Sequence, residues 1–452
     1  MQAETLRSAQ PDKGTGAVAW GLLTGLTIAV LLAVLPAQTA AKYILAVGGA
    51  ALIFRQPLLG LYFFLAGLAF LPTLYAGQLL LGTAAVYALR RALAGQRMFS
   101  RTPVDLPLAV FFTFVVLAAL FSVARAGSLA VLPLYGLFFL AFYLMYVLPR
   151  PADVAWLLGG LLLAGAVTAL LAWLQYKSGV QTSLSWIDIK QAEVIRTRVF
   201  ATFENPNIYA EYLTFVIPPA LVLFVREKYL PARFVWGVVL ASAGVALVLT
   251  MSRGAWLAVG LAFLLLGLFW ERRLLCVIAA GLLLLPILAP EQVLTRAASI
   301  GSLEDSSNAF RLSIWFAVVR MIAAYWLTGI GLGAAAFGQV YPQFMLAGTP
   351  ALHSHNLYLE LALQLGVPGL VAFLWLLLAV FSRAARAVPR LKAGTRSLLI
   401  ALIAGLSGFL LHGAVDNVWY SPKLTFLFWA VLGLALALTK EADDPAGTAH
   451  HQ

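Results

Sequence analysis

The sequence predicts an all-α polytopic membrane protein with about 12–14 transmembrane helices. Of its 452 residues, 62% are hydrophobic and only 11% are charged, and the mean hydropathy is +0.92. A soluble domain carries roughly 25% charged residues, so this composition excludes an ordinary soluble protein. Apolar runs of roughly 15 to 25 residues recur along the whole chain, and runs of this length can cross a bilayer.

The apolar runs define the order of the predicted spans. The first run follows a polar N-terminus without a small-residue cleavage pattern, so we expect a retained span and not a signal peptide. Segment 41–54 is short, and segment 76–93 could instead lie in the interface. The predicted spans lie near 16–36, 41–54, 57–74, 76–93, 105–123, 129–148, 153–175, 206–225, 232–250, 254–270, 273–289, 356–382, 395–415 and 423–439.

Basic residues alternate with the spans. The formal net charge is +12, but no basic patch with interleaved aromatic residues indicates a nucleic-acid partner. With the N-terminus inside, the cytoplasmic connections hold most of the basic residues, as the positive-inside rule requires, and both termini face the cytoplasm. The opposite short loops hold few of them: Lys42, Arg125, Arg253 and Lys423. The single cysteine, Cys276, lies in an apolar segment, so we expect no disulfide framework and no cysteine-based metal site.

Two connections on the outer side are much longer than the others. Residues 176–205 and 290–355 are polar, and loops of this length are usually functional or disordered. In the second, Ser307-Asn308 can cap a helix that runs to about Trp326 and could rest on the membrane surface as a lid. Its apolar residues share one side: Phe310, Ile314, Val318 and Met321.

Polar residues gather at four places on this outer side. The first is the segment 198–207, where Asn205 or Asn207 can cap the next helix and Pro206 suits its first turn. A helix N-terminus beside Arg198 could bind an anion. The alternative is a well-capped helix beside a solvated arginine.

The second place is the turn around Ser252-Arg253-Gly254. Gly254 supplies the small residue that a helical hairpin needs, and Arg253 is a rare cation on the outer side. Arg253 could bind a phosphate group, or it could extend toward lipid phosphates at the membrane surface.

The third place is the segment with His353 and His355, and the fourth is the segment around Asp416. His353 and His355 would diverge on a helix and lack an evident third ligand, so zinc is not expected, but either could transfer a proton near neutral pH. Asp416, preceded by His412, could cap the last span or hold a histidine or an arginine in place. Arginine forks match the oxygens of a pyrophosphate. Four aromatic residues could stack on sugar rings: Trp186, Tyr358, Trp419 and Tyr420.

These motifs resemble the O-antigen ligase/polymerase superfamily. His355-Asn356, nine further residues, Gly366 and Gly369 match its H-N-x9-G-x-x-G pattern. Residues 198–207 resemble its R-x-x-G-T-F-x-N-P-N segment, with Ala201 where glycine is usual. The resemblance covers roughly residues 195–440 and includes three further features: Ser252-Arg253-Gly254, Arg311 with Trp315, and Gly329–Gly333.

The resemblance implies a membrane glycosyltransferase with the C-type fold, an active site outside the cytoplasm and a place in the bacterial inner membrane. It implies a donor glycan on undecaprenyl pyrophosphate and a metal-independent, inverting reaction without a cofactor. His355 would then activate the acceptor hydroxyl. The expected substrate-binding residues are Arg198, Arg253, Arg311, Asn207, His353 and Asp416. The expected organisation is a transmembrane bundle at 1–175, a catalytic region at 176–439 with the loop 290–355, and a cytoplasmic tail at 440–452.

The sequence does not determine which acceptor receives the glycan. A ligase would transfer the glycan to lipid A–core or another acceptor, whereas a polymerase would join lipid-linked repeat units and a third group would glycosylate protein. We expect the ligase type. A transporter or flippase for lipid-linked sugars would place ionisable residues at mid-membrane on paired broken helices, but here they gather at one face.

Overall fold

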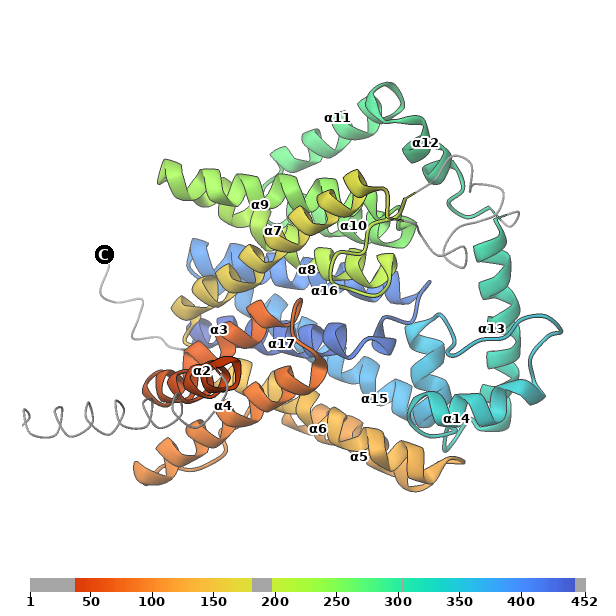
Figure 1. Cartoon of the computed structure of the whole chain (residues 1–452), viewed down its shortest axis with the longest axis horizontal. Helices are drawn as coiled ribbons and strands as arrows, with labels where there is room; N and C mark the ends of the chain where they lie inside the picture. The colour runs from red at the N-terminus through yellow and green to blue at the C-terminus, as the bar shows by residue number, and fades with distance from the viewer. Residues whose placement is uncertain (1–36, 181–196, 303–304, 444–452) are drawn as a thin grey trace, which may run out of the picture. The chain divides into compact units, whose positions relative to one another are not determined.

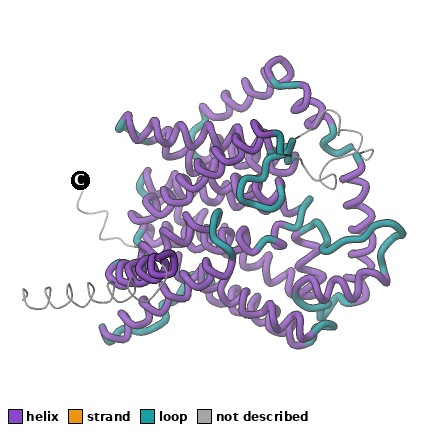
Figure 2. The backbone as a smooth tube through the Cα atoms, in the orientation of Figure 1, coloured by secondary structure: helices purple, strands orange, loops and turns teal. Residues whose placement is uncertain are grey.

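The computed structural model describes residues 37–180, 197–302 and 305–443. These residues form helices joined by turns and loops, with no strand among them (Figure 2), which confirms the predicted all-α fold. The chain divides into two compact units, residues 1–59 and 60–452. The first unit contains α2 (Ala37–Arg55) and the beginning of α3 (Pro57–Gly67).

The second unit contains the remaining helices. Those before the first long connection are α4 (Thr73–Leu93), α5 (Asp105–Leu120), α6 (Arg125–Val147) and α7 (Val154–Ser178). Those in the middle are α8 (Pro206–Arg226), α9 (Leu230–Leu249), α10 (Arg253–Phe269) and α11 (Arg273–Leu288). Those that follow are α12 (Glu291–Ala298), α13 (Ser306–Ala324), α14 (Gly333–Val340), α15 (Leu357–Ala387), α16 (Ala393–Gly413) and α17 (Pro422–Leu438). Short 3-10 helices are η1 (Pro151–Asp153), η4 (Tyr341–Gln343), η5 (Val388–Arg390), η6 (Val418–Tyr420) and η7 (Thr439–Asp443).

Every predicted span within the described residues coincides with a helix, whereas the span at 16–36 lies outside them. Seven helical segments of the described chain are long and apolar enough to cross a membrane, or eight if the bent pair α11 and α12 forms one span. This number is lower than the number of expected spans because helices such as α5 and α10 are shorter than a full crossing. The protein is therefore a polytopic membrane protein.

Helix α17 lies inside the bundle, since its side chains from Leu424 to Leu438 are buried. It packs against α6, while α5 packs against α15, and α16 packs against both α8 and α10. Trp429 of α17 meets aromatic rings from α5 and α6, including Phe111 and Phe142. Helices from both halves of the sequence therefore build one core.

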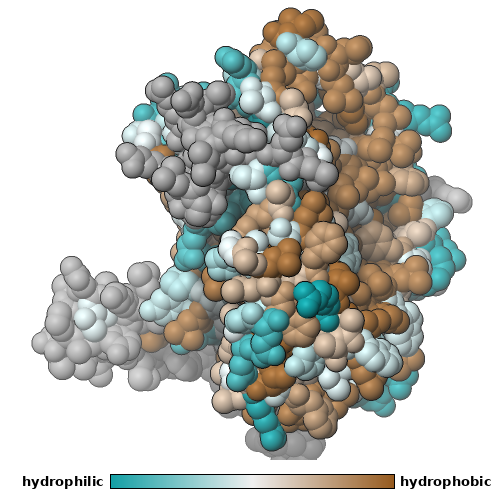
Figure 3. Space-filling model, turned by 90° about the vertical axis from the view of Figure 1, so that its right-hand side faces the viewer, coloured by the Kyte–Doolittle hydropathy of each residue, from teal (hydrophilic) through white to brown (hydrophobic). Residues whose placement is uncertain are grey.

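Helix α13 runs across the ends of the bundle helices (Figure 1). Its buried side consists of Ile314, Ala317, Val318 and Met321, which join a core with α14 and Leu363 of α15. The predicted apolar stripe is thus mostly correct, although Phe310 stays 36% exposed. The predicted cap was wrong: Asp305 is the N-cap, and its carboxylate accepts a hydrogen bond from the backbone N–H of Asn308 at 3.2 Å. On this face, hydrophilic patches lie among broad apolar areas (Figure 3).

Helix α15 is broken at Gly366, where φ is 75°. The segment after α13 hydrogen-bonds to the broken turn: Ile330 N–H donates to the Leu363 carbonyl at 2.8 Å, and Val367 N–H donates to the Trp326 carbonyl at 2.7 Å. A Cβ on Gly366 would lie 2.4 Å from the Leu327 oxygen, and a Cβ on Gly329 would lie 2.3 Å from the Gln364 oxygen. The glycines of the two motifs therefore allow the backbone after α13 to meet the broken turn of α15.

Candidate active site

The loop at residues 197–205 leads into α8. Of the two asparagines that could cap this helix, Asn205 is the N-cap, and its side-chain oxygen accepts from the N–H of Asn207 at 2.7 Å. Ala201 has φ 49°, a left-handed conformation that glycine adopts without strain. Gln175 fixes this turn, because its Oε1 accepts from Ala201 N–H at 2.8 Å and its Nε2 donates to the Ala201 carbonyl at 2.8 Å. The departure from the usual glycine is therefore accommodated by an anchored loop.

Arg198 is buried within this loop. Its Nε donates to the Thr250 carbonyl at 2.9 Å, and its Nη2 donates to Asn207 Oδ1 at 2.8 Å. Burial lowers the pKa of Arg198 to about 9, and the positive charges of Arg296, Arg311 and Arg253 lower it further in that order. Several guanidinium groups from different helices thus act on one place, as expected where an anion is to be bound.

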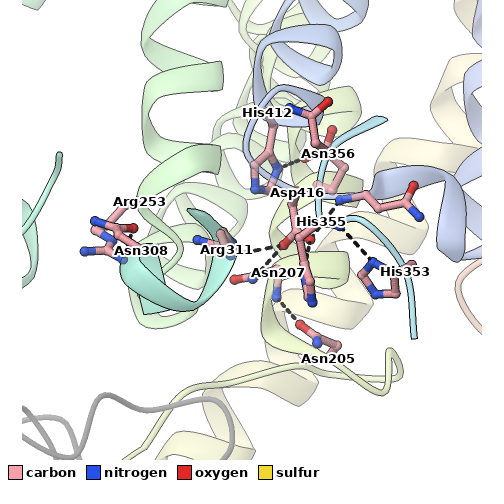
Figure 4. A network of polar contacts seen from close by, with 12 residues as sticks. Asn205, Asn207, Arg253, Asn308, Arg311, His353, His355, Asn356, His412 and Asp416 are labelled. Atoms are coloured by element: carbon pink, nitrogen blue, oxygen red, sulfur yellow. Dashed lines mark hydrogen bonds and ion pairs between the residues drawn. The ribbon is translucent and has the colours of Figure 1, made fainter. Parts of the chain in front are cut away.

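Asp416 is the centre of the polar network (Figure 4). Asn207 Nδ2 donates to its Oδ2 at 2.9 Å, Arg311 Nη2 lies 3.5 Å from the same oxygen, and His355 Nδ1 lies 3.2 Å from Oδ1. Burial would raise the pKa of Asp416, but the His355 hydrogen bond and the Arg311 charge hold it well below its usual range. Since Ser421 caps the last helix, Asp416 holds a histidine and an arginine and does not cap that span.

His355 lies directly before α15 with φ 51°, a strained conformation for a side chain of this size. Asn356 caps α15 by accepting from Tyr358 N–H at 2.9 Å, and its Nδ2 donates to the Ala414 carbonyl at 2.7 Å. The carboxylate of Glu360 accepts from Ser354 N–H at 2.8 Å. These contacts tie the loop to its own helix and to the end of α16, so the imidazole of His355 is held in place.

His353 lies beside His355 and supports it. Its Nδ1 accepts from the backbone N–H of His355 at 3.2 Å, and the two rings are 4.1 Å apart. Burial lowers the pKa of His353 to about 4, with a further contribution from the charge of His355. Among the described residues, no group of three or more His, Cys, Asp or Glu side chains is arranged to hold a metal ion.

Arg253 lies apart from the His355–Asp416 pair, beside Asn308 (Figure 4). Its Nη1 and Nη2 lie 2.9 and 3.0 Å from the two carboxylate oxygens of Asp305, and both side chains are buried. Arg253 therefore does not extend toward lipid. Arg296 of α12 also contacts Asp305, at 3.6 Å. Sequence reasoning missed Asp305 and Arg296, although an acid directly before Ser306-Ser307-Asn308 is itself a cap signal.

A second buried pair lies one helical turn further into the bundle. Glu211 follows Asn207 by four residues on α8, and its carboxylate contacts Nδ1 of His412, whose carbonyl accepts the N–H of Asp416 at 3.0 Å. A Cβ on Gly254 would lie 2.3 Å from the His412 ring, so the motif glycine makes room for this pair. Sequence reasoning missed Glu211, although an acid inside a membrane span is itself a functional signal.

The structure separates the four predicted stacking residues. Tyr420 is 52% exposed, whereas Trp419 is buried and Tyr358 donates its hydroxyl to the Leu410 carbonyl at 2.8 Å. Trp186 lies outside the described residues.

The fold and the site define a class: a multi-pass membrane protein with a cluster of arginine, histidine and aspartate at one end of its helix bundle. Residues 236–374 match the family model of the O-antigen ligase, which supports the superfamily that the motifs predicted. The match runs from α9 into α15 and includes Arg253, Arg311 and His355. No curated protein matches the sequence.

Proposed function

We propose that this protein transfers a glycan from undecaprenyl pyrophosphate to an acceptor hydroxyl on the extracytoplasmic side of the bacterial inner membrane, as an O-antigen ligase. The family match supports a glycosyltransferase-like ligase or polymerase that uses a lipid-linked glycan and a glycan acceptor. The observation that carries the proposal is the contact between His355 and Asp416 beside the arginine cluster.

His355 acts as the general base. Because the ionised Asp416 carboxylate can only accept, Nδ1 of His355 carries the proton toward it, and Nε2 keeps the lone pair that takes the hydroxyl proton. Asp416 then stabilises the imidazolium that forms. Its own charge is fixed by Asn207 and Arg311, so the pair is ready before the acceptor arrives.

The arginines bind the pyrophosphate that leaves. Arg311 is partly exposed and faces Asp416, while Arg198 supplies a buried positive charge through Asn207. The guanidinium of Arg253 is already paired with Asp305. Arg253 therefore contributes to the positive electrostatic potential of the site but offers few free hydrogen-bond donors. Fixed cations of this kind can stabilise the leaving group in place of a metal ion, which supports a metal-independent reaction. A single direct attack by the acceptor hydroxyl that His355 activates would invert the anomeric carbon.

The position of the site on α15 supports the proposed orientation. His355 precedes the N-terminus of α15, and Arg386 lies in its last turn, at the opposite end of the helix. Under the positive-inside rule the Arg386 end faces the cytoplasm, so the site and the long connection 290–355 face outward.

The test uses purified protein in vesicles with an undecaprenyl-pyrophosphate-linked glycan, alone or with lipid A–core. We expect a single transfer that requires lipid A–core, its loss in His355→Ala at unchanged expression, and unchanged activity in EDTA. A ladder from donor alone would identify a polymerase. Wild-type turnover by His355→Ala would exclude the assigned base, and sugar-lipid that crosses the bilayer without any product would identify a transporter.

A further inference from the structure

Three rings form a continuous row that leads from the surface to the proposed base. The Tyr420 and His353 ring centroids are 4.7 Å apart at an angle of 34°, and those of His353 and His355 are 4.1 Å apart. Tyr420 is the exposed end of this row, since it is 52% exposed while its neighbour Trp419 is 8% exposed.

The position of the row is fixed relative to the catalytic pair. Tyr420 ends η6, four residues after Asp416, and its N–H donates to the Asn417 carbonyl at 3.2 Å. His353 is tied to His355 through the hydrogen bond at Nδ1. Because its pKa is about 4, the His353 ring is uncharged at neutral pH and stacks on Tyr420 as an aromatic ring.

His353 lies on one side of His355, and Arg253 and Arg311 lie on the other. Figure 4 shows Arg253 and Arg311 on one side of the His355–Asp416 contact and His353 on the opposite side. In an inverting displacement the attacking hydroxyl and the leaving pyrophosphate lie on opposite sides of the anomeric carbon. The acceptor must therefore approach from the side of His353 and Tyr420.

We propose that Tyr420, supported by His353, is the platform on which the acceptor's sugar ring stacks. This inference rests on the proposed function. A pyranose has a face of C–H groups that packs on an aromatic ring, while its hydroxyls stay free for hydrogen bonds, and tyrosine offers both an apolar face and a polar tip. The stack aligns the reacting hydroxyl with Nε2 of His355.

The experiment measures transfer at saturating donor while lipid A–core is varied, or a soluble repeat-unit oligosaccharide if the protein proves to be a polymerase. Tyr420→Ala should raise the acceptor KM by about five- to tenfold and leave the donor KM unchanged, and Tyr420→Phe should restore the wild-type value. The matched control is Tyr229→Ala, an exposed tyrosine between α8 and α9, which should behave as wild type.

Binding is measured separately from turnover by saturation-transfer NMR, with the lipid-free core or repeat-unit oligosaccharide and the inactive His355→Ala protein. We expect a saturation-transfer signal on the protons of the terminal sugar. This signal should be lost in the double variant that carries both His355→Ala and Tyr420→Ala. An unchanged acceptor KM in Tyr420→Ala would overturn the proposed role of Tyr420. Transfer of the donor glycan to a serine-containing peptide in place of the carbohydrate acceptor would overturn it as well. Activity of His355→Ala would overturn the proposed function instead, so the two failures are distinguishable.

Discussion

His355 and Asp416 contact each other across 61 positions of the sequence, with Nδ1 of the histidine 3.2 Å from Oδ1 of the aspartate. The strained backbone of His355 points its imidazole toward the end of α16, where Asn207 and Arg311 also meet the carboxylate. This contact determines which ring nitrogen is free for chemistry, and it is the basis of the first prediction.

Asp416→Asn should lower kcat by about 10²–10⁴-fold, because an amide can stabilise the wrong tautomer of His355 and cannot stabilise the imidazolium. The KM for the donor should change much less, since the arginines remain. Steady-state kinetics with the lipid-linked donor measure both parameters. A wild-type kcat would show that Asp416 does not act through His355.

Arg311→Ala should raise the donor KM by roughly 10- to 100-fold, because it removes the charge-assisted contact to the pyrophosphate that the proposed function gives to Arg311. Arg320→Ala is the matched control: Arg320 is on the same helix, exposed and stacked on Phe344, and its loss should leave the donor KM unchanged. Equal effects of both variants would indicate a general disturbance of α13.

Asp305→Asn should destabilise the protein by about 3–5 kcal/mol, because it leaves the buried Arg253 without its carboxylate. Arg253→Lys should also be poor, since a point charge cannot replace a bidentate fork. Thermal unfolding of the two single variants and the double variant measures the coupling. Additive effects would show that the ion pair does not account for the stability that these two residues contribute. A fully active and stable Arg253→Lys variant would show that the bidentate guanidinium is not required.

Gly366→Ala should lower stability by about 1–2 kcal/mol or more, because alanine disfavours a φ of 75° and its Cβ would meet the Leu327 carbonyl. Gly260→Ala is the matched control, because Gly260 lies in α10 with open space around it, and alanine should there be neutral or favourable by about 0.5–1 kcal/mol. The comparison uses thermal unfolding in the same detergent. Equal destabilisation by both substitutions would contradict the special role of the break.

The pH dependence of stability should report His353. Its folded pKa of about 4 lies below the ordinary value of 6.5, so the unfolded chain binds the proton first as pH falls. The stability that neutral His353 contributes is present above pH 6.5 and is lost toward pH 4. His353→Phe keeps a ring beside Tyr420 and should flatten the dependence of Tm on pH in this window. An unchanged slope would assign the dependence to other groups.

The sequence by itself determined the membrane class, the positions of the apolar helices among the described residues and the resemblance to the O-antigen ligase superfamily. It also limited the cap of α8 to Asn205 or Asn207, because hydropathy, capping and motif spacing act between residues close together in the chain. It identified His355, Arg198, Asn207, Arg311 and Asp416 as polar residues on one predicted side, but it could not say which of them touch.

Only the tertiary structure decided the contacts within the site. Asn207 and Asp416 are 209 positions apart, and whether they meet depends on how α8 packs against α16. The same packing brings Glu211 into contact with His412. The path of the chain through α12 places Asp305 beside Arg253, where the two form an ion pair. Such pairings depend on crossing angles and side-chain volumes, which no local pattern encodes. Packing therefore decided which residues of the site are in contact.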